Sequence, residues 1–217
     1  MEIATRAVIA GESAFERDGF TFNETELRWP ILAGLLQAHA RDGYLSVIDV
    51  GGALGSLYWQ HRQVLIDLNV NWAVVEQEEF VDRGRQLPSN EVRFFTGLDE
   101  ALSTTNPNVV LFSSVLQYLD KPIDVVGQII SNTNASIIID RTPLSDSPRN
   151  IPTIQHVPAH IYAGSYAAWI ISNSELSNAL AEMSSLYRFP GIEPETFTSR
   201  GTRLRWQGLW ALRGDSQ

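Results

Sequence analysis

One twelve-residue stretch, residues 45–56, constrains the fold more than any other part of the sequence. An apolar, β-branched segment ends there in a turn that holds Gly51, Gly52 and Gly55, and residues 56–68 continue with helical character. A buried strand, a tight glycine turn and a helix start form the opening of a nucleotide-binding βα unit, because glycine lets the backbone approach a ligand and the first helical turn offers unpaired N–H groups. The stretch therefore predicts an α/β fold with a nucleotide-like ligand at the turn.

Strand and helix patterns alternate along the rest of the chain, which predicts a mostly parallel sheet with helices on both faces. Two segments of alternating apolar and polar residues, near 185–190 and 203–213, predict a closing antiparallel strand pair. The predicted inner strands are 45–50, 71–76, 92–95, 109–113 and 135–140, and the predicted helices are 24–40, 56–68, 78–87, 98–103, 121–131 and 174–183.

The pattern predicts a single domain over residues 1–217, because no repeat, low-complexity tract or linker interrupts it. Residues 1–44 are expected to form an N-terminal helical extension, and residues 45–213 the α/β core. Residues 141–172 contain four prolines and are expected to be a long irregular insertion. Long loops in compact domains are more often functional than accidental, so this insertion is expected to serve the site.

Composition excludes several classes of function. The formal net charge of −9 and the lack of a basic cluster argue against a nucleic-acid partner. The chain has no cysteine, which excludes disulfides, thiolate metal sites and cysteine nucleophiles. No apolar run approaches the roughly 20 residues needed to span a bilayer, so we expect no membrane span and a cytoplasmic location.

Two further kinds of site have weak support in the sequence. His156 and His160 stand four residues apart, but Pro158 between them disfavours the helix that would bring both to one ion, so no metal is expected. The dinucleotide fingerprint G-x-G-x-x-G, started at Gly51, places Ala53 at its second glycine and a serine at its third. An NAD(P)-dependent oxidoreductase therefore remains only a third hypothesis.

The segment from Asp49 to Gly55 resembles the first motif of class I S-adenosylmethionine-dependent methyltransferases, an acid-x-Gly-x-Gly-x-Gly pattern in which Ala53 occupies the middle glycine position. The likeness extends over roughly 45–213 and implies a Rossmann-like, seven-stranded, mostly parallel sheet. Glu76 closes the second predicted strand, where the family places an acid that accepts hydrogen bonds from both ribose hydroxyls. The loops after the third and fourth strands resemble those that surround the adenine and the methionine moiety. The implied cofactor is S-adenosylmethionine, and the implied cofactor-binding residues are Asp49, Gly51, Gly52, Ala53, Gly55, Glu76, Gln77, Gly97, Leu98, Ser113, Ser114 and Gln117.

A narrower likeness rests on residues 139–143, 155–162 and 165–166, which resemble a group of bacterial methyltransferases that accompany surface-polysaccharide biosynthesis. It implies a small-molecule or glycan-precursor acceptor, with the 141–172 insertion on the acceptor side. Three residues are candidates for catalysis: His156 as a general base, Asp140 at the end of the fifth strand, and Tyr162 in an aromatic lid.

Each of these residues also has a structural alternative. His156 could be a loop histidine bonded to backbone, and Asp140 could pair with Arg141. The aromatic residues of the expected lid, Tyr162, Tyr166 and Trp169, could instead pack in the core. For the whole chain, the alternative function is a cofactor-binding scaffold or partner protein that has lost catalysis.

Overall fold

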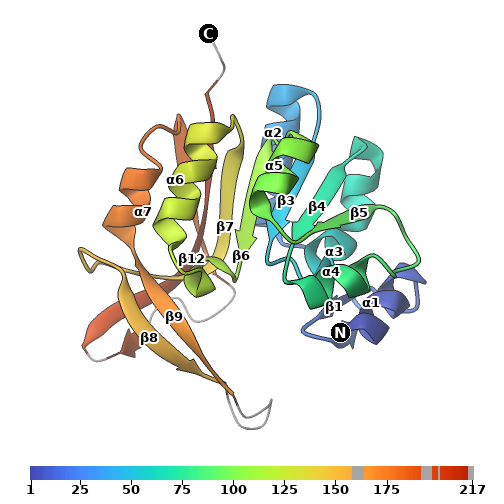
Figure 1. Cartoon of the computed structure of the whole chain (residues 1–217), viewed down its shortest axis with the longest axis horizontal. Coiled ribbons are helices and arrows are strands. Elements are labelled where there is room, and N and C mark those ends of the chain that lie inside the picture. Colours follow the sequence, from blue (N-terminus) through green and yellow to red (C-terminus); the bar gives the residue numbers. More distant parts are fainter. Residues whose placement is uncertain (158–163, 192–196, 200, 215–217) are drawn as a thin grey trace. The chain divides into compact units, whose positions relative to one another are not determined.

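The computed structural model describes residues 1–157, 164–191, 197–199 and 201–214. Contacts within the chain divide it into two compact units. Unit 1 comprises residues 1–112 and 135–138, and unit 2 comprises residues 113–134 and 139–217. Figure 1 labels most of the helices and strands of both units.

Unit 1 is built on a parallel sheet in which β6 (Val109–Ser113), β3 (Ser46–Val50), β4 (Asn71–Val75) and β5 (Val92–Phe95) are neighbours in that order. All residues of β3 and β6 are buried. The sheet therefore confirms the predicted parallel strands, and β5 and β6 have the predicted bounds. The helices of unit 1 are α1 (Glu2–Ile9), α2 (Trp29–Asp42), α3 (Ser56–Leu65), α4 (Glu78–Gly84) and α5 (Leu98–Thr105), and a 3-10 turn, η1 (Ile66–Leu68), extends α3.

The amino ends of the unit 1 strands are joined by one buried amide. Asn108 Oδ1 accepts from the Ser46 N–H at 2.9 Å, and its Nδ2 donates to Tyr44 O and to Asp42 Oδ2, each at 2.8 Å. Hydrogen bonds from Arg41, and then from Asn108, hold the pKa of Asp42 below its usual value against the opposing effect of burial. The side chain of Asn108 therefore links this edge of the sheet to the end of α2 through hydrogen bonds.

The N-terminal extension contains a β-hairpin as well as helices. β1 (Phe15–Arg17) and β2 (Phe20–Phe22) pair antiparallel around Asp18 and Gly19, which have φ of 53° and 85°. Two consecutive positive φ angles are typical of the tight hairpin turns that Asp-Gly favours. The predicted helix over 24–40 begins later, at Trp29, with Pro30 in its first turn, and ends at Gly43 in the left-handed conformation.

The described residues of unit 2 include the closing strands and the helices α6 (Pro122–Asn132) and α7 (Asn173–Ala179). β10 (Ser185–Pro190) pairs antiparallel with β12 (Thr202–Leu212), which confirms the predicted pair, and β11 (Phe197–Ser199) adds to β12. β7 (Ser136–Ser145) begins in unit 1 and continues through unit 2, where β12 is its neighbour.

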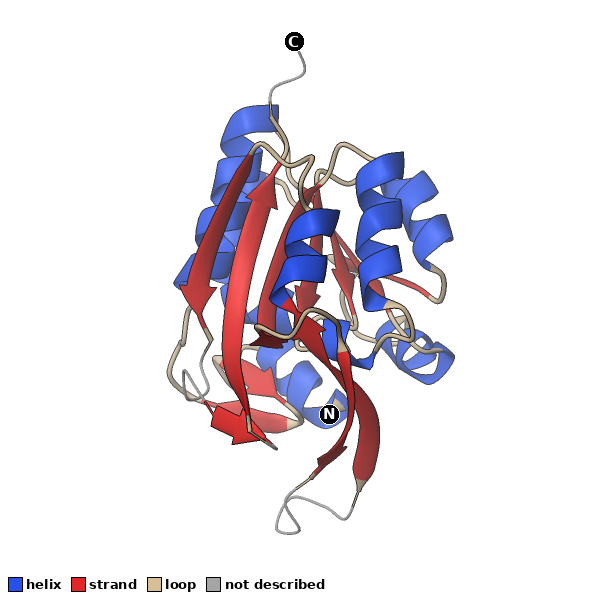
Figure 2. Ribbon diagram, turned by 90° about the vertical axis from the view of Figure 1, so that its left-hand side faces the viewer, coloured by secondary structure: helices blue, strands red, loops and turns tan. Residues whose placement is uncertain are grey.

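The prediction of an irregular segment over 141–172 is wrong. β7 continues to Ser145, and β8 (Ile151–His156) pairs antiparallel with β9 (Ser165–Ser172) to form a ribbon that extends away from the helices of unit 2 (Figures 1 and 2). Pro152 is tolerated because β8 pairs only with β9 among the described strands, so one of its edges needs no ladder N–H. Proline content therefore indicated an edge strand here, not a loop.

In the described part of the chain, no helix is both long enough and apolar enough to cross a membrane.

Candidate functional site

The glycine turn after β3 depends on three left-handed residues. Gly51, Ala53 and Gly55 have φ of 69°, 53° and 84°. The turn is closed by the Gly55 N–H, which donates to Gly52 O at 2.9 Å, and Gly55 is the residue before the first turn of α3. Ala53 follows the same left-handed path as its glycine neighbours, at a cost of about 1–2 kcal/mol for a residue with a Cβ.

Asp49 explains why the turn needs glycine at position 52. Its carboxylate is buried in the centre of β3, and a Cβ built on Gly52 would lie 2.5 Å from Asp49 Oδ2. The acid therefore packs directly beneath the turn and occupies the space that a side chain at 52 would need. This contact gives a physical reason for the spacing between the acid and the glycines.

Three neighbouring strand ends bring the predicted adenosine residues to one edge of unit 1. The Gly51 N–H donates to Val75 O at 2.9 Å, which places the glycine turn beside the end of β4, where Glu76 follows. The Glu76 N–H in turn donates to Phe95 O at 3.0 Å, at the end of β5. Gly97 is the residue before the first turn of α5 and Leu98 is the first residue of that helix. Ligands of open α/β sheets bind at this carboxyl edge.

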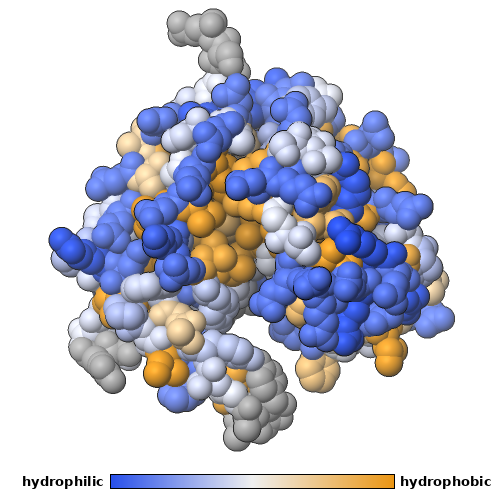
Figure 3. Space-filling model, viewed as in Figure 1, coloured by the Kyte–Doolittle hydropathy of each residue, from blue (hydrophilic) through white to orange (hydrophobic). Residues whose placement is uncertain are grey.

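The Glu76 carboxylate has spare acceptor capacity. Its Oε2 accepts from the Gln77 N–H at 2.8 Å, and this is its one hydrogen bond among the described residues. Gln77 is the residue before α4, whose first turn carries two acidic side chains, and Figure 3 shows hydrophilic residues over this helix. Acids favour a helix start electrostatically, so α4 has an ordinary reason for its charge. Glu76 differs from these acids because it directly follows Val75, whose carbonyl accepts from the Gly51 N–H of the glycine turn.

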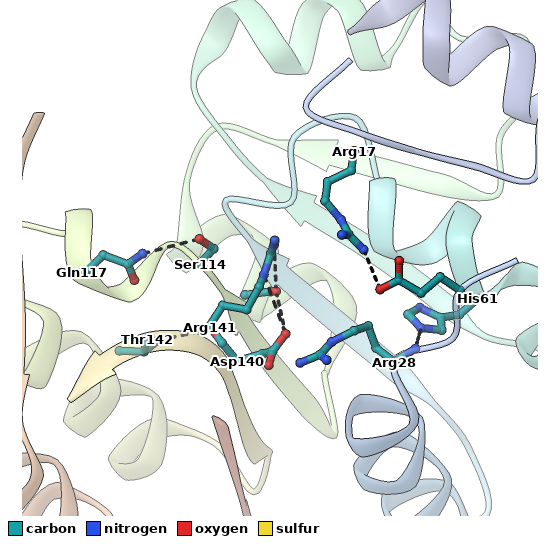
Figure 4. A network of polar contacts seen from close by, with 10 residues as sticks. Arg17, Arg28, His61, Ser114, Gln117, Asp140, Arg141 and Thr142 are labelled. Atoms are coloured by element: carbon teal, nitrogen blue, oxygen red, sulfur yellow. Dashed lines mark hydrogen bonds and ion pairs between the residues drawn. The ribbon is translucent and has the colours of Figure 1, made fainter. Parts of the chain in front are cut away.

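Helix α3, which follows the turn, is held by buried polar contacts on two sides. Glu16 of β1 accepts a short hydrogen bond from the Ser56 hydroxyl and a 3.1 Å bond from the Gly19 N–H. Burial raises the pKa of Glu16, although these bonds oppose it. His61 lies deeper, with Nε2 accepting from the Arg28 N–H at 2.9 Å and Nδ1 donating to Leu57 O at 2.7 Å, a pattern that requires the neutral ring (Figure 4).

The outer side of α3 is joined to the segment before β5. Arg62 forms a two-pronged ion pair with Glu91, at 2.7 and 3.1 Å, and the Tyr58 hydroxyl donates to the same carboxylate at 2.7 Å. Burial acts to raise the pKa of Glu91, but the bonds from Arg62 and Tyr58 outweigh it and hold that pKa below its usual value. The helix that carries the turn is thus fixed at its start, middle and outer face.

A second group of predicted residues lies together in unit 2, at the end of β6 and in the middle of β7. Ser113 Oγ donates to Asp140 Oδ2 at 3.4 Å, and the Ser114 N–H donates to Asp140 O at 3.0 Å. Gln117 is fully buried and its Nε2 donates to Ser114 Oγ at 3.5 Å. Asp140 also pairs with Arg141, one of the two alternatives for that residue, with Arg141 Nε 3.8 Å from Asp140 Oδ2 (Figure 4).

The other catalytic candidates are not brought to this group by any described contact. His156 is the exposed last residue of β8, and within the described part of unit 2 no hydrogen bond joins it to Asp140. Tyr162 lies outside the described residues. Trp169 is half-buried and its Nε1 donates to Leu119 O at 3.1 Å, whereas Tyr166 is 43% exposed.

Three residues near these groups were not selected from the sequence. Glu16 lies in a hairpin that the weak N-terminal signals did not reveal, although the Asp18-Gly19 pair was available as a turn signal. Arg141 was considered only as a partner of Asp140. Tyr118 lies 6.3 Å from Tyr166 between ring centroids, a contact that depends on the ribbon being folded.

A pocket found in unit 1 lies apart from the predicted site residues. It has a volume of about 520 Å³, is lined in part by Val8, Glu12, Asn23 and Gln63, and contains none of the predicted residues. Among the described residues, no group of three or more histidine or acidic side chains is arranged to hold a metal ion.

Comparison with known proteins finds this fold in S-adenosylmethionine-dependent methyltransferases. The N-terminal domain of EvdMO1 with S-adenosylhomocysteine (SAH) bound matches with a TM-score of 0.56 at 14% identity, over 98% of this chain and 96% of that chain. The same domain in the presence of SAH and D-fucose gives a TM-score of 0.55. Human N-acetylserotonin methyltransferase in complex with S-adenosylmethionine (SAM) gives 0.52 at 14% identity, over 84% of this chain and 51% of that chain. No protein-family model and no curated protein matches the chain. At these identities the likeness shows the fold.

Proposed function

We propose that this chain transfers a methyl group from SAM to a small-molecule or glycan-precursor acceptor. The observation that carries the proposal is the position of Glu76, one parallel strand away from a glycine turn whose backbone is left-handed at three positions. The chain acts as one methyltransferase-like domain over 1–217, with its core at 45–213 and the segment 141–172 on the acceptor side.

The residues of unit 1 suit an adenosine. A carboxylate such as that of Glu76 accepts hydrogen bonds from two vicinal hydroxyls at once, which matches the ribose. The glycine turn, supported from below by Asp49, admits a ligand close to its backbone. Gly97 and Leu98, at the start of α5, border the same edge and are assigned to the adenine.

The residues of unit 2 suit the amino-acid part of the donor and the acceptor. Ser113, Ser114 and Gln117 are assigned to the methionine moiety, and Gln117 Oε1 is a buried acceptor with no hydrogen bond from any described residue. SAM supplies an electrophilic methyl group when bound, so the protein's contribution is mainly alignment and exclusion of water. His156 is assigned the removal of a proton from the acceptor, Asp140 the orientation of the acceptor, and Tyr162 the aromatic lid over it.

The ribbon supports a sugar-like acceptor. Tyr118 and Tyr166 are 40% and 43% exposed and form an edge-to-face pair, and the Tyr118 hydroxyl donates to Gln155 Oε1 at 2.7 Å. Exposed aromatic rings beside a side-chain amide are a suitable surface for the mixed apolar and hydroxyl faces of a sugar. The EvdMO1 domain, which shares the fold, was solved with D-fucose present. A glycan precursor used in surface-polysaccharide synthesis is the acceptor that we propose.

Isothermal titration with SAM and SAH tests the cofactor directly. We expect binding by the wild type, and at least tenfold weaker binding by Glu76→Ala, because two charge-assisted hydrogen bonds are lost. Glu79→Ala is the matched control, since Glu79 is an exposed acid of the neighbouring helix that pairs with Arg83. Absence of binding at millimolar ligand, or equal binding by Glu76→Ala and wild type, contradicts the proposal.

Transfer itself is tested with labelled SAM and a panel of sugar phosphates and nucleotide sugars. His156→Gln is expected to lower turnover while leaving the SAH affinity unchanged, since His156 is assigned to the acceptor only. Tight cofactor binding without transfer to any acceptor would favour a cofactor-binding scaffold. Binding of NADH instead of SAH, followed by fluorescence, would favour an oxidoreductase.

A further inference from the structure

Two residues that are not glycine have the left-handed backbone conformation, one directly after β6 and one inside β7. Ser114 has a φ of 59° and Arg141 a φ of 49°, and the Ser114 N–H donates to the carbonyl of Asp140, the residue before Arg141. Each such residue costs about 1–2 kcal/mol in backbone strain. Strain of this kind persists where the surrounding structure fixes it, and it gathers at ligand sites. Two strained residues therefore mark this part of unit 2, and a hydrogen bond joins one of them, Ser114, to the residue before the other.

The second of these residues, Arg141, is a cationic residue in a strand that is otherwise buried. Arg141 is the one residue of β7 that is not buried. Behind it, Asp140 is 1% exposed and holds Arg141 Nε at 3.8 Å, and Ser113 Oγ accepts from Arg141 Nη2 at 3.4 Å. Arg141 is thus the left-handed, partly exposed residue of β7, and two side chains contact its guanidinium at long distances.

The guanidinium has more donors than these contacts use. A guanidinium carries five N–H donors, and among the described residues Arg141 contacts only Asp140 and Ser113, both at long distances. The next residue after Ser113 is Ser114, whose hydroxyl accepts from Gln117 Nε2 at 3.5 Å and can itself donate to an anion. In a chain with a net charge of −9, a partly exposed arginine with unused donors is a specific place for an anion.

We propose that Arg141 is an anion-binding residue, which binds a carboxylate or phosphate oxygen of a small molecule held at this end of unit 2. The ligand assignment rests on the proposed methyl transfer, whereas the anion site itself does not. Two sources carry such a group: the carboxylate of the methyl donor, and an acidic group on the acceptor. Arginine suits either, because its planar fork makes two parallel hydrogen bonds to such oxygens.

Arg141→Asn is the decisive variant. It removes the guanidinium, but asparagine tolerates the left-handed conformation, so the backbone of β7 keeps its path. Arg205→Asn is the matched control, because Arg205 is a partly exposed arginine of β12 that pairs with an acid, Asp146, at 3.7 Å. Thermal unfolding of both variants establishes that each is folded before any titration.

The first measurement compares SAH with 5′-methylthioadenosine, which lacks the amino-acid carboxylate, by isothermal titration. If the donor carboxylate is the source, Arg141→Asn weakens SAH binding by roughly 10- to 100-fold and leaves 5′-methylthioadenosine binding unchanged. If the acceptor is the source, both ligands bind Arg141→Asn as they bind wild type, and the second measurement shows the loss.

The second measurement follows the backbone N–H resonances of Ser114 and Arg141 by NMR during titration with inorganic phosphate and with acetate, at constant ionic strength set by potassium chloride. The wild type and Arg205→Asn are expected to respond to phosphate or acetate with saturation, and Arg141→Asn is expected to lose the response. The inference is overturned if Arg141→Asn matches wild type in both measurements. If the wild type binds no SAH yet shows the anion response, the proposed function fails and the anion site stands.

Discussion

The contact between Asp49 and Gly52 makes a sharp prediction about the glycine turn. In Gly52→Ala the new Cβ would lie 2.5 Å from Asp49 Oδ2 and 2.6 Å from its Cγ, well inside van der Waals contact. Asp49 has little freedom to move away, since β3 pairs with β4 on one side and with β6 on the other. The turn must shift instead. We expect a loss of about 1–3 kcal/mol, the usual cost of overpacking a buried site.

Thermal unfolding measures this loss. For a chain of this length, each 1 kcal/mol lowers the Tm by about 2–4 °C, so Gly52→Ala should melt roughly 2–12 °C below wild type. Gly127→Ala is the control, because Gly127 lies inside α6 and its added Cβ meets nothing within 4 Å. Alanine is favoured over glycine within helices by up to about 1 kcal/mol, so this variant should gain stability. The same substitution is therefore expected to have opposite signs at the two positions.

A double-mutant cycle identifies the cause. In an Asp49→Ala background the obstructing carboxylate is gone, so the cost of Gly52→Ala should fall by at least about 1 kcal/mol. An equal cost of Gly52→Ala in both backgrounds would refute the reasoning, as would a Gly52→Ala variant as stable as wild type. Titration of the same variants with SAH then reports whether the shifted turn still binds.

Three further predictions concern unit 1. Ala53→Gly should relieve left-handed strain and raise stability by up to about 1 kcal/mol after the entropy of the added glycine is subtracted, and an unchanged or lower Tm would contradict this. Burial acts to raise the pKa of Glu91, but hydrogen bonds from Arg62 and Tyr58 outweigh it and hold that pKa low in the folded protein. Below about pH 4.3, the ordinary pKa of a glutamate, the unfolded chain therefore binds more protons at this residue than the folded protein does. Wild-type stability should fall as the pH drops through the lowered pKa. Glu91→Gln should flatten this part of the curve of urea midpoint against pH, and parallel curves for the two proteins would exclude the effect. Asn108→Ala removes three hydrogen bonds, one of them buried and two partly buried, and should cost about 2–3 kcal/mol in urea unfolding; a loss below about 0.5 kcal/mol would mean that water replaces the amide.

The inner strands could be predicted from the sequence because each is an apolar run buried on both faces. β5 and β6 have the predicted bounds, and β3 begins within one residue of its predicted start. Such runs are set by local composition, so no knowledge of their neighbours is required. The closing strands were also recognisable, since alternation of apolar and polar residues reports a strand with one covered face.

The ribbon and the hairpin could not be predicted in the same way. β8 and the first part of β9 are mostly exposed, so neither carries a hydrophobic pattern, and prolines suggested a loop. The hairpin strands β1 and β2 have three residues each, too short for any periodicity. Both structures depend on cross-strand pairing, which the sequence of one strand does not reveal.

The candidate site divides along the same line. The glycine turn and Glu76 could be predicted as site residues because they follow predicted strands and resemble a known motif. Arg141 could not, because its role depends on a left-handed kink inside β7 and on contacts with Ser113 and Asp140, which come together only in the folded unit. Ala53 differs from the glycine of the resembling motif, but its backbone has the same left-handed conformation as Gly51 and Gly55.

The chain leaves the body of unit 2 for the ribbon and returns to it at one place. Leu144 pairs in parallel with Ile171, and Ser145 with Ser172, so the first and last residues of the excursion lie side by side. The Ser172 hydroxyl donates to Ser147 O at 2.7 Å and closes the base. Insertions and deletions are tolerated best in exposed segments, and β8 and the first part of β9 are mostly exposed. The 26 residues between Ser145 and Ser172 therefore leave and rejoin unit 2 at one point, so the length of this segment can change while the pairing at its base stays the same.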